Sequence, residues 1–418
     1  MHIKLGYGKG FAELNIEDEN LLGVIKPNAA DTKISVDEEI KSALENPIGT
    51  KRLKDIVSPG ERIAIITSDI TRPMPSKVVM PFILEELYRA GIQAEDIKIV
   101  FALGSHRKHT EEEKKALVGE KVYSQIECID SDVNDCINMG RTSSGTPMDI
   151  FRVVAEADRR ICLGNIEYHY FAGYSGGIKA IMPGVSTRQA IQANHSKMVM
   201  EWARTGELDR NPVRQDMEET ASYVSVDFIL NVVLDENKNI VKAVAGHHMK
   251  AHREGCRFLD SMYRVRVDEP ADIVVVSAGG YPKDINLYQA QKALDNARHA
   301  VREGGIIILL AGCKEGLGEK VFEQWIRSAK SPDDLIERIQ TDFQLGGHKA
   351  AAIAMVLKHC DVYLVSEMDD DEVRKLFMQP YSDIQSAYGD ALHRLGPESK
   401  VFVIPWGGST LPWTETDK

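Results

Sequence analysis

Apolar runs alternate with helix-like stretches along the chain from about residue 60. The run at 62–67 (RIAIIT) has the continuous apolar character of a buried strand, and apolar residues recur at helical spacing over 76–90 in spite of Pro81. The run at 97–102 (IKIVFA) is again strand-like. A strand, a helix and a strand in this order predict a βαβ unit with a largely parallel sheet.

The segments that follow extend this pattern and add a hairpin. Thr110 followed by three glutamates predicts a capped helix start, and 160–164 (RICLG) predicts another strand. Between 226 and 245, apolar and polar residues alternate on both sides of 235–239 (DENKN), which predicts a β-hairpin. Antiparallel strands are therefore expected in the first domain too, followed by a helix over about 247–262.

The second half of the chain shows the same alternation. It opens with a predicted strand at 272–277 (DIVVVS), followed by a loop and a helix over about 286–302. Apolar residues at helical spacing predict the core stripe of that helix: Leu287, Ala290, Leu294, Ala297 and Val301. Further strands are expected at 306–311, 361–366 and 401–404.

The periodicity breaks at Val267-Asp268-Glu269-Pro270, where we place a domain boundary. A chain of 418 residues suits two domains, since domains usually have roughly 100 to 200 residues. We predict an α/β fold with two mixed α/β domains, residues 1–266 and 271–418, and an active site in the cleft between them. The last residues are expected to pack back on the first domain.

Charge and composition narrow the function classes. A net charge of -12 argues against nucleic-acid or anionic-membrane partners, because phosphate groups need a basic face. No window approaches the roughly 18 apolar residues of a membrane span, and the first residues lack a secretory signal pattern. The six cysteines form no C-x-x-C pair, which is typical of reduced thiols. We therefore expect a cytoplasmic protein that draws an anionic substrate to local cations.

Two loops after strand-like runs carry candidate chemistry. In 68–73 (SDITRP), Pro73 disfavours helical geometry at Arg72 and leaves its guanidinium for bidentate pairing with a carboxylate or phosphate. A structural Asp–Arg ion pair explains the same residues. In 102–110 (ALGSHRKHT), His106 is a candidate acid or base near neutral pH, and an idle exposed histidine is the alternative.

The segment 164–184 is the richest in chemistry. Its five glycines, with one lysine and one histidine amid aromatic residues, predict a backbone that approaches a flat or phosphate-bearing ligand. It is not a Walker A loop, because the glycine spacing before Lys179 is wrong and Ala180 replaces the magnesium-binding Ser or Thr. After it, Ser186 can cap a short helix that ends near His195, which alone is typical of a helix-end histidine.

Taken in order, these segments resemble the nickel-dependent lactate racemase family. The shared motifs are Ser-Asp-x-Thr-Arg-Pro, Gly-x-His-Arg, His-x(4)-Tyr-Ser-Gly-Gly-x-Lys-Ala-x-x-Pro-Gly and Asn-His. The likeness continues in 280–282 (GYP), in Tyr288-Gln289-x-x-Lys292, in 343–349 and in 410–412, and so covers nearly the whole chain.

The resemblance implies a nickel-pincer nucleotide, nickel pyridinium-3,5-bisthiocarboxylic acid mononucleotide, tethered through a thioamide to Lys179. It implies that His195 is the fourth nickel ligand, and soft sulfur with one imidazole agrees with the preferences of nickel. It also implies three cofactor-biosynthesis enzymes as partners: a carboxylase/hydrolase, a sulfur transferase and a nickel insertase. Further cofactor contacts are expected from Asp69, Thr71, Gly176 and Gly177.

By the same resemblance the protein is an isomerase, a racemase or epimerase that inverts C2 of a small 2-hydroxy acid. His106 and His169 match the acid–base pair on the substrate hydroxyl, and Arg72 matches the residue that holds its carboxylate. Hydride transfer to and from the cofactor through a 2-keto acid avoids a carbanion next to a carboxylate. The substrate site is expected to be completed by Gln289, Lys292 and Tyr288.

Two other interpretations stay open. A zinc hydrolase is conceivable because His248 and His252 are four residues apart, although the His-Glu-x-x-His pattern is missing. A non-catalytic carrier of the pincer cofactor leaves Arg72 and two histidines without a role. Lactate, longer or aromatic hydroxy acids, malate-like diacids and sugar acids all suit the same central residues.

Overall fold

The computed structural model describes residues 1–28 and 35–414 of the chain. They form a mixed α/β fold of two compact units, which confirms the predicted class. Unit 1 joins Met1–Ala29 to Ser261–Lys418, and unit 2 is the continuous stretch Ala30–Asp260. Within the described residues, no helix is long and apolar enough to cross a membrane.

Unit 2 contains a six-stranded sheet in the order β13-β12-β9-β4-β5-β6. All neighbours are parallel except β12 and β13, which form the predicted antiparallel hairpin. The parallel pair β4 and β5 confirms the predicted βαβ unit. The strands are β4 (Ile63–Ser68), β5 (Ile97–Ala102), β6 (Glu127–Asp130), β9 (Arg159–Ile166), β12 (Phe228–Leu234) and β13 (Ile240–Gly246).

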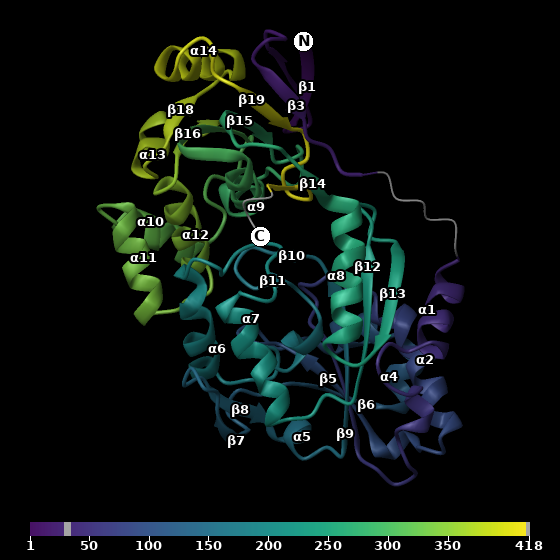
Figure 1. The fold of residues 1–418 in the computed structure, drawn as a ribbon. Helices are drawn as coiled ribbons and strands as arrows, with labels where there is room; N and C mark the ends of the chain where they lie inside the picture. Colours follow the sequence, from purple (N-terminus) through teal and green to yellow (C-terminus); the bar gives the residue numbers. More distant parts are fainter. Residues whose placement is uncertain (29–34, 415–418) are drawn as a thin grey trace. The chain divides into compact units, whose positions relative to one another are not determined.

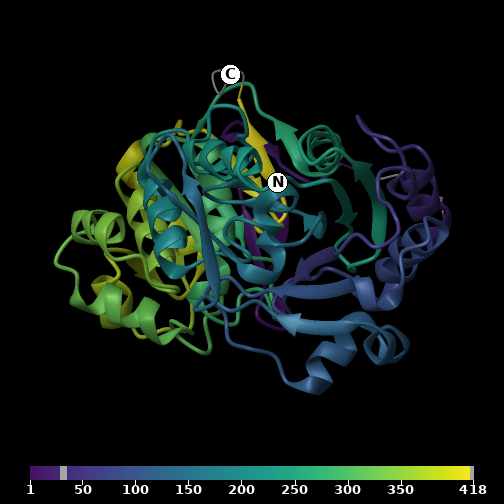
Figure 2. The same ribbon diagram turned by 90° about the horizontal axis from the view of Figure 1, so that it is seen from below.

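Helices cover both faces of this sheet. The purple and dark-blue helices α1 and α2 lie together on one side (Figures 1 and 2), where Ile40 and Ile83 join strand residues such as Ile65 in one buried cluster. Figure 1 shows α6 and α7 on the opposite side. The helices are α1 (Val36–Glu45), α2 (Ser76–Arg89), α3 (Glu111–Val118), α4 (Glu120–Gln125), α5 (Arg152–Ala155), α6 (Arg188–His195), α7 (Pro212–Glu219) and α8 (Lys250–Tyr263).

Two small antiparallel hairpins lie outside this sheet in unit 2. One pairs β7 (Cys136–Arg141) with β8 (Pro147–Phe151). The other is the two-residue pair β10 (Tyr168–His169) and β11 (Gly173–Tyr174), in which His169 stands opposite Gly173. The second hairpin lies inside the glycine-rich segment, so it fixes the backbone of one candidate acid–base residue.

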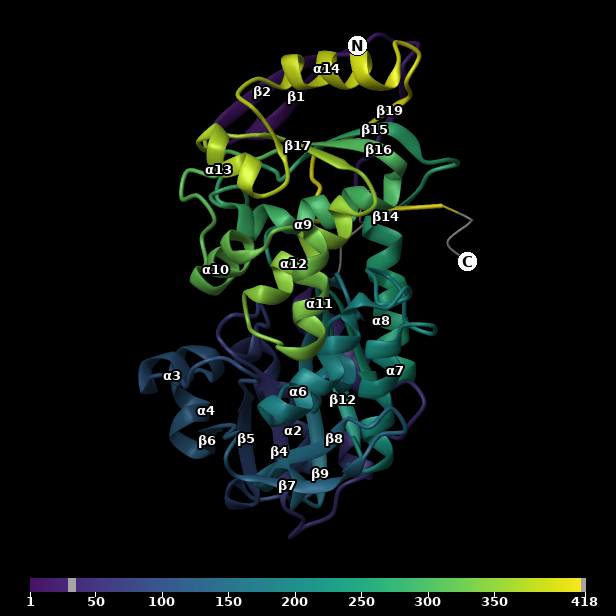
Figure 3. The same cartoon turned by 90° about the vertical axis from the view of Figure 1, so that its left-hand side faces the viewer.

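Unit 1 contains a second six-stranded sheet, in the order β18-β17-β16-β15-β19-β3 and parallel throughout. Its strands are β3 (Leu21–Val24), β15 (Ala271–Ser277), β16 (Val301–Leu310), β17 (Asp361–Val365), β18 (Gln379–Tyr381) and β19 (Val401–Ile404). The hairpin of β1 (His2–Tyr7) and β2 (Gly10–Asn15) and the helix α14 (Ile384–Leu395) pack on one face of it (Figure 3).

The other face of the unit 1 sheet carries α9 (Leu287–Ala297) and α12 (Gly347–Leu357), as Figure 3 shows. The remaining helices are α10 (Lys320–Ser328), α11 (Pro332–Thr341) and α13 (Asp370–Lys375). The last described strand, β20 (Leu411–Trp413), pairs in parallel with β14 (Arg264–Arg266). Both of these short strands belong to unit 1, so the last described strand pairs with the beginning of the second segment of this unit.

The units differ from the predicted limits of 1–266 and 271–418 at the start of the chain. The first residues belong to unit 1, because β3 extends its sheet with Leu21 opposite Val401. The hairpin residues Ile3 and Leu5 are buried in the same core. The division in the middle of the chain lies at Ser261, near the predicted break in periodicity.

Two predicted helices have different ends. The helix expected over 286–302 ends at Ala297, and after a 3-10 turn Val301 begins β16, so Val301 is buried from a strand and not from the helical stripe. The helix expected over 247–262 begins only at Lys250. His248 therefore lies in the turn before α8, and the two imidazoles of the zinc hypothesis do not share a helix face.

Candidate active site

The loop after β4 folds into a turn that buries one carboxylate. The backbone N–H of Arg72 donates to the carbonyl of Asp69 at 3.1 Å, which closes the turn. The hydroxyl of Thr71 donates to Oδ1 of Asp69 at 2.9 Å. The side chain of Asp69 is buried, with 4% exposed, although it lies in a loop. A buried carboxylate requires strong donors, and Thr71 is the first of them.

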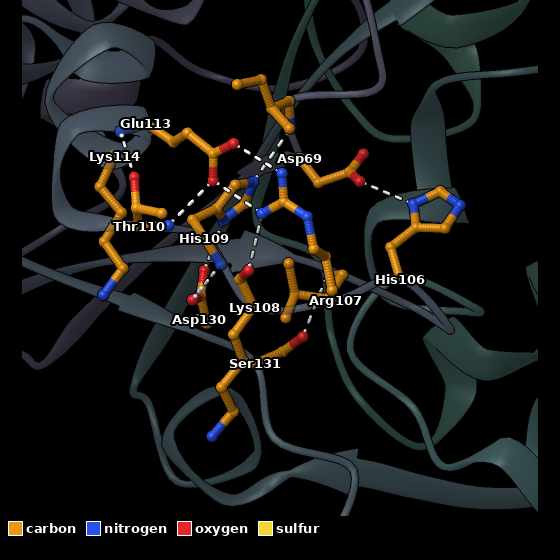
Figure 4. Close-up of polar contacts among 12 residues, drawn as sticks. Asp69, His106, Arg107, Lys108, His109, Thr110, Glu113, Lys114, Asp130 and Ser131 are labelled. Atoms are coloured by element: carbon orange, nitrogen blue, oxygen red, sulfur yellow. Dashed lines mark hydrogen bonds and ion pairs between the residues drawn. The ribbon is translucent and has the colours of Figure 1, made fainter.

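The loop after β5 supplies the second donor, His106. Nδ1 of His106 lies 2.6 Å from Oδ2 of Asp69, and Figure 4 shows the carboxylate directed at the ring. Burial raises the pKa of Asp69, but the hydrogen bond and charge of His106 and the hydroxyl of Thr71 outweigh it, so the pKa is lowered. An ionised carboxylate only accepts hydrogen bonds. Nδ1 of His106 therefore carries a proton, and the neutral ring has its lone pair on Nε2.

The backbone that carries His106 is fixed at the start of α3. The two terminal guanidinium nitrogens of Arg107, Nη1 and Nη2, donate to Glu113 at 2.8 and 2.6 Å (Figure 4). Glu113 also accepts the backbone N–H of Thr110 at 2.8 Å, completing the capping box that the sequence predicts. The hydrogen bond from Arg107 lowers the pKa of Glu113 to about 2. The helix cap thus anchors the loop of the candidate base.

His169 is held in a different tautomer. Its Nδ1 accepts the backbone N–H of Ala172 at 3.2 Å. Burial, followed by the charges of Lys179, Arg72 and His195, lowers the pKa of His169 well below its usual range. The ring is therefore neutral and carries its proton on Nε2, the reverse of His106.

Lys179 lies in a 3-10 turn and is partly exposed. Burial is the main cause that lowers the pKa of its amine well below the usual value. The positive charges of Arg72 and Arg214 lower this pKa further, while the charge of Glu167 raises it. A lowered pKa raises the fraction of the amine that is neutral, and the neutral amine is a nucleophile, whereas an ammonium is not. Arg72 itself faces Glu167, with 3.8 Å between Nη1 and Oε1.

The glycines before Lys179 serve the packing of the turn. Gly176 and Gly177 have φ values of 76° and 60°, which favour glycine. A Cβ on Gly176 would lie 2.8 Å from Oδ1 of Asn231, and one on Gly177 would lie 3.0 Å from the ring of His252. A side chain at either glycine would thus collide with β12 or α8. Their predicted contact with a cofactor stays a prediction.

His195 ends α6, whose cap is Thr187 and not the predicted Ser186. Nδ1 of His195 lies 2.9 Å from Oδ1 of Asn194. The amide nitrogen of Asn194 donates to Oδ2 of Asp216 at 2.7 Å, so its orientation is fixed and Oδ1 must accept from His195. The proton is therefore on Nδ1 and the lone pair on Nε2, as in histidines that bind a metal through Nε2.

Asp216 is the centre of this arrangement. Its buried carboxylate also accepts from Lys197 Nζ at 3.0 Å and from the hydroxyls of Thr142, Ser144 and Thr146. Burial raises the pKa of Asp216, but the hydrogen bonds from the hydroxyls of Ser144 and Thr142 and from the amide of Asn194 outweigh burial. The pKa of Asp216 is therefore lowered. Sequence reasoning missed Asp216 and the role of Asn194. The Asn-His pair was the one available signal.

The predicted residues of unit 2 come together in space. The ring of Phe171 contacts both His169 and His195, with centroid separations of 4.5 and 4.9 Å. The charge of Arg72 acts on Asp69, His169 and Lys179 alike. One region of unit 2 therefore combines an amine of lowered pKa, a guanidinium and three oriented imidazoles.

The other predicted site residues lie in unit 1, on α9. Asn286 caps this helix, and Leu287, Ala290 and Leu294 are buried as predicted. Gln289 and Lys292 are exposed and three residues apart, so they share a face as expected. Tyr288 is partly buried, its carbonyl accepts from Lys349 Nζ at 2.5 Å, and the same ammonium lies 4.0 Å from the ring centroid of Tyr288.

The zinc interpretation finds no support in the described part of the chain. Nε2 of His252 lies 2.8 Å from the carbonyl oxygen of Ser175, and its ring touches Cys256. Among residues 1–28 and 35–414, no three His, Cys, Asp or Glu side chains are grouped so that they could hold a metal. His252 instead ties α8 to the glycine-rich segment.

Comparison with known proteins identifies the family. The family model described as "Lactate racemase N-terminal domain" matches residues 7–206, and "Lactate racemase C-terminal domain" matches residues 267–411. The chain belongs to the lactate racemase family. The lactate racemase of Thermoanaerobacterium thermosaccharolyticum is 38% identical over 422 residues, 98% of this chain and 99% of that protein. The lactate racemase of Lactiplantibacillus plantarum is 35% identical over 417 residues, 97% and 98% of the two chains.

Solved structures agree with this assignment. The lactate racemase apoprotein from Thermoanaerobacterium thermosaccharolyticum matches with a TM-score of 0.88 and 37% identity, covering 99% of this chain and 100% of that one. A Thermotoga maritima protein with 16% identity and a TM-score of 0.63 covers 93% of this chain and all of its own, and shares the fold. As a member of the lactate racemase family, the chain is a racemase-type isomerase.

Proposed function

We propose that this enzyme inverts C2 of a small 2-hydroxy acid with the help of a nickel-pincer nucleotide tethered to Lys179. The lowered pKa of the Lys179 amine, with the charge of Arg72 acting on both Lys179 and His169, is the observation that carries the proposal. A neutral amine can form the thioamide tether, and a neighbouring guanidinium can bind a carboxylate. Lactate is the first substrate to test, because both relatives are named lactate racemases.

The residues present fit the cofactor. His195 has its lone pair on Nε2, because Asn194 accepts from Nδ1, and a neutral imidazole is the form that binds nickel. When bound, the group supplies a hydride acceptor that takes the substrate to a 2-keto acid and back. Asp69, Thr71, Gly176 and Gly177 remain proposed contacts, with Asp69 holding His106 as well.

The chain's own residues then bind the substrate and move its proton. Arg72 pairs with the substrate carboxylate. Nε2 of His106 accepts the hydroxyl proton, and the ionised Asp69 stabilises the imidazolium that forms. His169 presents Nε2–H to the substrate oxygen. It can accept a proton at Nε2 only when Nδ1 releases the N–H of Ala172 and takes up the ring proton.

Unit 1 is proposed to contribute the remaining substrate-binding residues. Gln289 and Lys292 are exposed on one face of α9, so both are available to a hydroxy acid, and Tyr288 precedes them. The proposed partners in the cell are the carboxylase/hydrolase, the sulfur transferase and the nickel insertase that make the cofactor. The choice between racemase and epimerase depends on whether the substrate has further stereocentres.

The test is to mature the protein with the three biosynthesis enzymes and to measure loss of optical purity in a panel of 2-hydroxy acids. Intact mass should show an adduct on the mature wild type and none on Lys179→Ala or on the charge-retaining Lys179→Arg. Full activity of protein without nickel would refute the proposal. An adduct without turnover of any hydroxy acid would favour a cofactor carrier instead.

A further inference from the structure

His109 joins three loops at the carboxyl end of the unit 2 sheet. Its Nε2 lies 3.0 Å from the backbone nitrogen of Ile70 in the loop after β4. Its Nδ1 lies 2.6 Å from Oδ1 of Asp130 at the end of β6, and Oδ2 of Asp130 accepts the backbone N–H of His109 at 2.9 Å. Figure 4 shows His109 directed at Asp130, away from His106.

These partners fix the state of the His109 ring. Asp130 can only accept when ionised, so Nδ1 of His109 donates to it. A backbone N–H can only donate, so Nε2 of His109 accepts from Ile70. The imidazole is therefore neutral and has one orientation. The side chains of His109 and Asp130 are 1% and 6% exposed, which protects both hydrogen bonds from competition by water.

The N–H that His109 binds belongs to the turn that carries the site residues Asp69, Thr71 and Arg72. Ile70 lies between Asp69 and Arg72 in this turn, and its own side chain is 41% exposed and adds little packing. The other hydrogen bonds of the turn are local ones, apart from the contacts of Asp69 and Thr71 with Nδ1 of His106. The bond to His109 is thus a backbone anchor from outside the turn.

We propose that His109, supported by Asp130, is a positioning residue that sets the Asp69–Arg72 turn for the reaction. Through Asp69 it aligns His106, and through the turn it places the guanidinium of Arg72. The kinetic part of this inference rests on the proposed function, which assigns His106 and Arg72 to the substrate. Its structural part, the order of the turn, stands on the hydrogen bonds alone.

The experiment compares two substitutions at His109. His109→Phe keeps a ring against Phe101, which it contacts at a centroid distance of 5.2 Å, and removes both nitrogens. His109→Gln keeps an acceptor at the position of Nε2. His359→Phe is the matched control, because it removes the 3.1 Å contact between a half-buried histidine and the carbonyl of Val301 in unit 1.

Two readouts are taken on the full chain. Amide hydrogen exchange is followed in the apoprotein at Ile70. A hydrogen bond of ordinary strength corresponds to a change of roughly three- to tenfold, so exchange at Ile70 should accelerate by about this factor in His109→Phe. In the mature enzyme kcat should fall and KM for the hydroxy acid should rise. His109→Gln should restore both readouts, and His359→Phe should change neither.

The outcomes separate the alternatives. Faster exchange at Ile70, with altered kcat and KM that the glutamine variant restores, supports the positioning role. A lower melting temperature of His109→Phe with unchanged exchange at Ile70 and unchanged kcat and KM overturns it, as does faster exchange without a kinetic effect. Inactive mature wild type would instead refute the proposed function, while exchange at Ile70 would still decide whether His109 holds the turn.

Discussion

Oδ2 of Asp69 lies 2.6 Å from Nδ1 of His106, and this pair decides which nitrogen of the ring faces away from the carboxylate. Asp69 thus orients His106 as a base, and its negative charge compensates the positive charge that the imidazole gains with a proton.

We expect Asp69→Asn to lower kcat by about 10²-fold or more, because a neutral amide neither fixes the tautomer of His106 nor stabilises its imidazolium. Steady-state racemisation by the mature enzyme measures this. Thr71→Val is the matched control, since it removes one donor to Asp69 at 2.9 Å and should cost less than about tenfold. Full activity of Asp69→Asn would contradict the role given to the pair.

The amide of Asn194 should be needed for nickel binding more than for attachment of the cofactor to Lys179. In Asn194→Leu, Nδ1 of His195 loses its acceptor at 2.9 Å, and changes of this kind typically reduce metal affinity by about 10- to 100-fold. After maturation, elemental analysis should show reduced nickel while intact mass still shows the adduct on Lys179. Thr142→Val, which removes one of several donors to Asp216, should retain nickel. Equal nickel in Asn194→Leu and wild type would argue against His195 as the ligand.

Stability should fall on the acid side in a way that depends on His252. Burial lowers the pKa of His252 well below 6.5, so the unfolded chain binds its proton first as the pH falls. The free energy of unfolding therefore begins to fall near pH 6.5. It decreases by roughly 1.4 kcal/mol for each unit by which the pH is lowered, until the pKa of His252 in the folded state is reached.

Urea unfolding at pH 7 and pH 5 tests this expectation. His252→Gln should be less sensitive to pH than wild type, because one imidazole no longer titrates. His169 has a lowered pKa as well and acts with the same sign, so the dependence should shrink without vanishing. An identical pH dependence in wild type and variant would show that His252 is protonated equally in both states.

Two glycine substitutions should change stability in opposite directions. Gly176→Ala places a Cβ 2.8 Å from Asn231 Oδ1 at φ 76°, and should destabilise unit 2 by about 1–3 kcal/mol. Gly389→Ala lies inside α14 with no atom within 4 Å of the added Cβ, and should stabilise by about 1 kcal/mol. Melting temperatures measure both. A neutral Gly176→Ala would mean that the turn before Lys179 can relax.

Much of the fold could be predicted because its signals are local. The continuous apolar runs of β4 and β5 and the polar turn between β12 and β13 specify these elements over a few residues. The place of β3 could not be predicted, because its partner β19 lies at the other end of the sequence. Val301 fitted a helical stripe although it begins a strand, since burial alone does not distinguish the two.

For the site, the sequence indicates the reactive side chains but not what orients them. His106, His169 and His195 are readable from motifs, whereas their tautomers depend on Asp69, on a backbone N–H and on Asn194. The orientation of the Asn194 amide depends in turn on Asp216, 22 residues away. Asp69 was expected at the cofactor, and its hydrogen bond to His106 depends on two loops meeting in space.

The edge strand β3 has a consequence for biosynthesis on the ribosome. Unit 2 is one uninterrupted stretch, so every strand of its sheet is made before the second segment of unit 1, which begins at Ser261. The hairpin of β1 and β2 and the strand β3 are translated before unit 2, but β19, the neighbour of β3, is translated after it. Unit 2 can thus acquire its structure while β3 still lacks its neighbour β19, and a chaperone that shields an exposed β-strand has its target in Leu21–Val24.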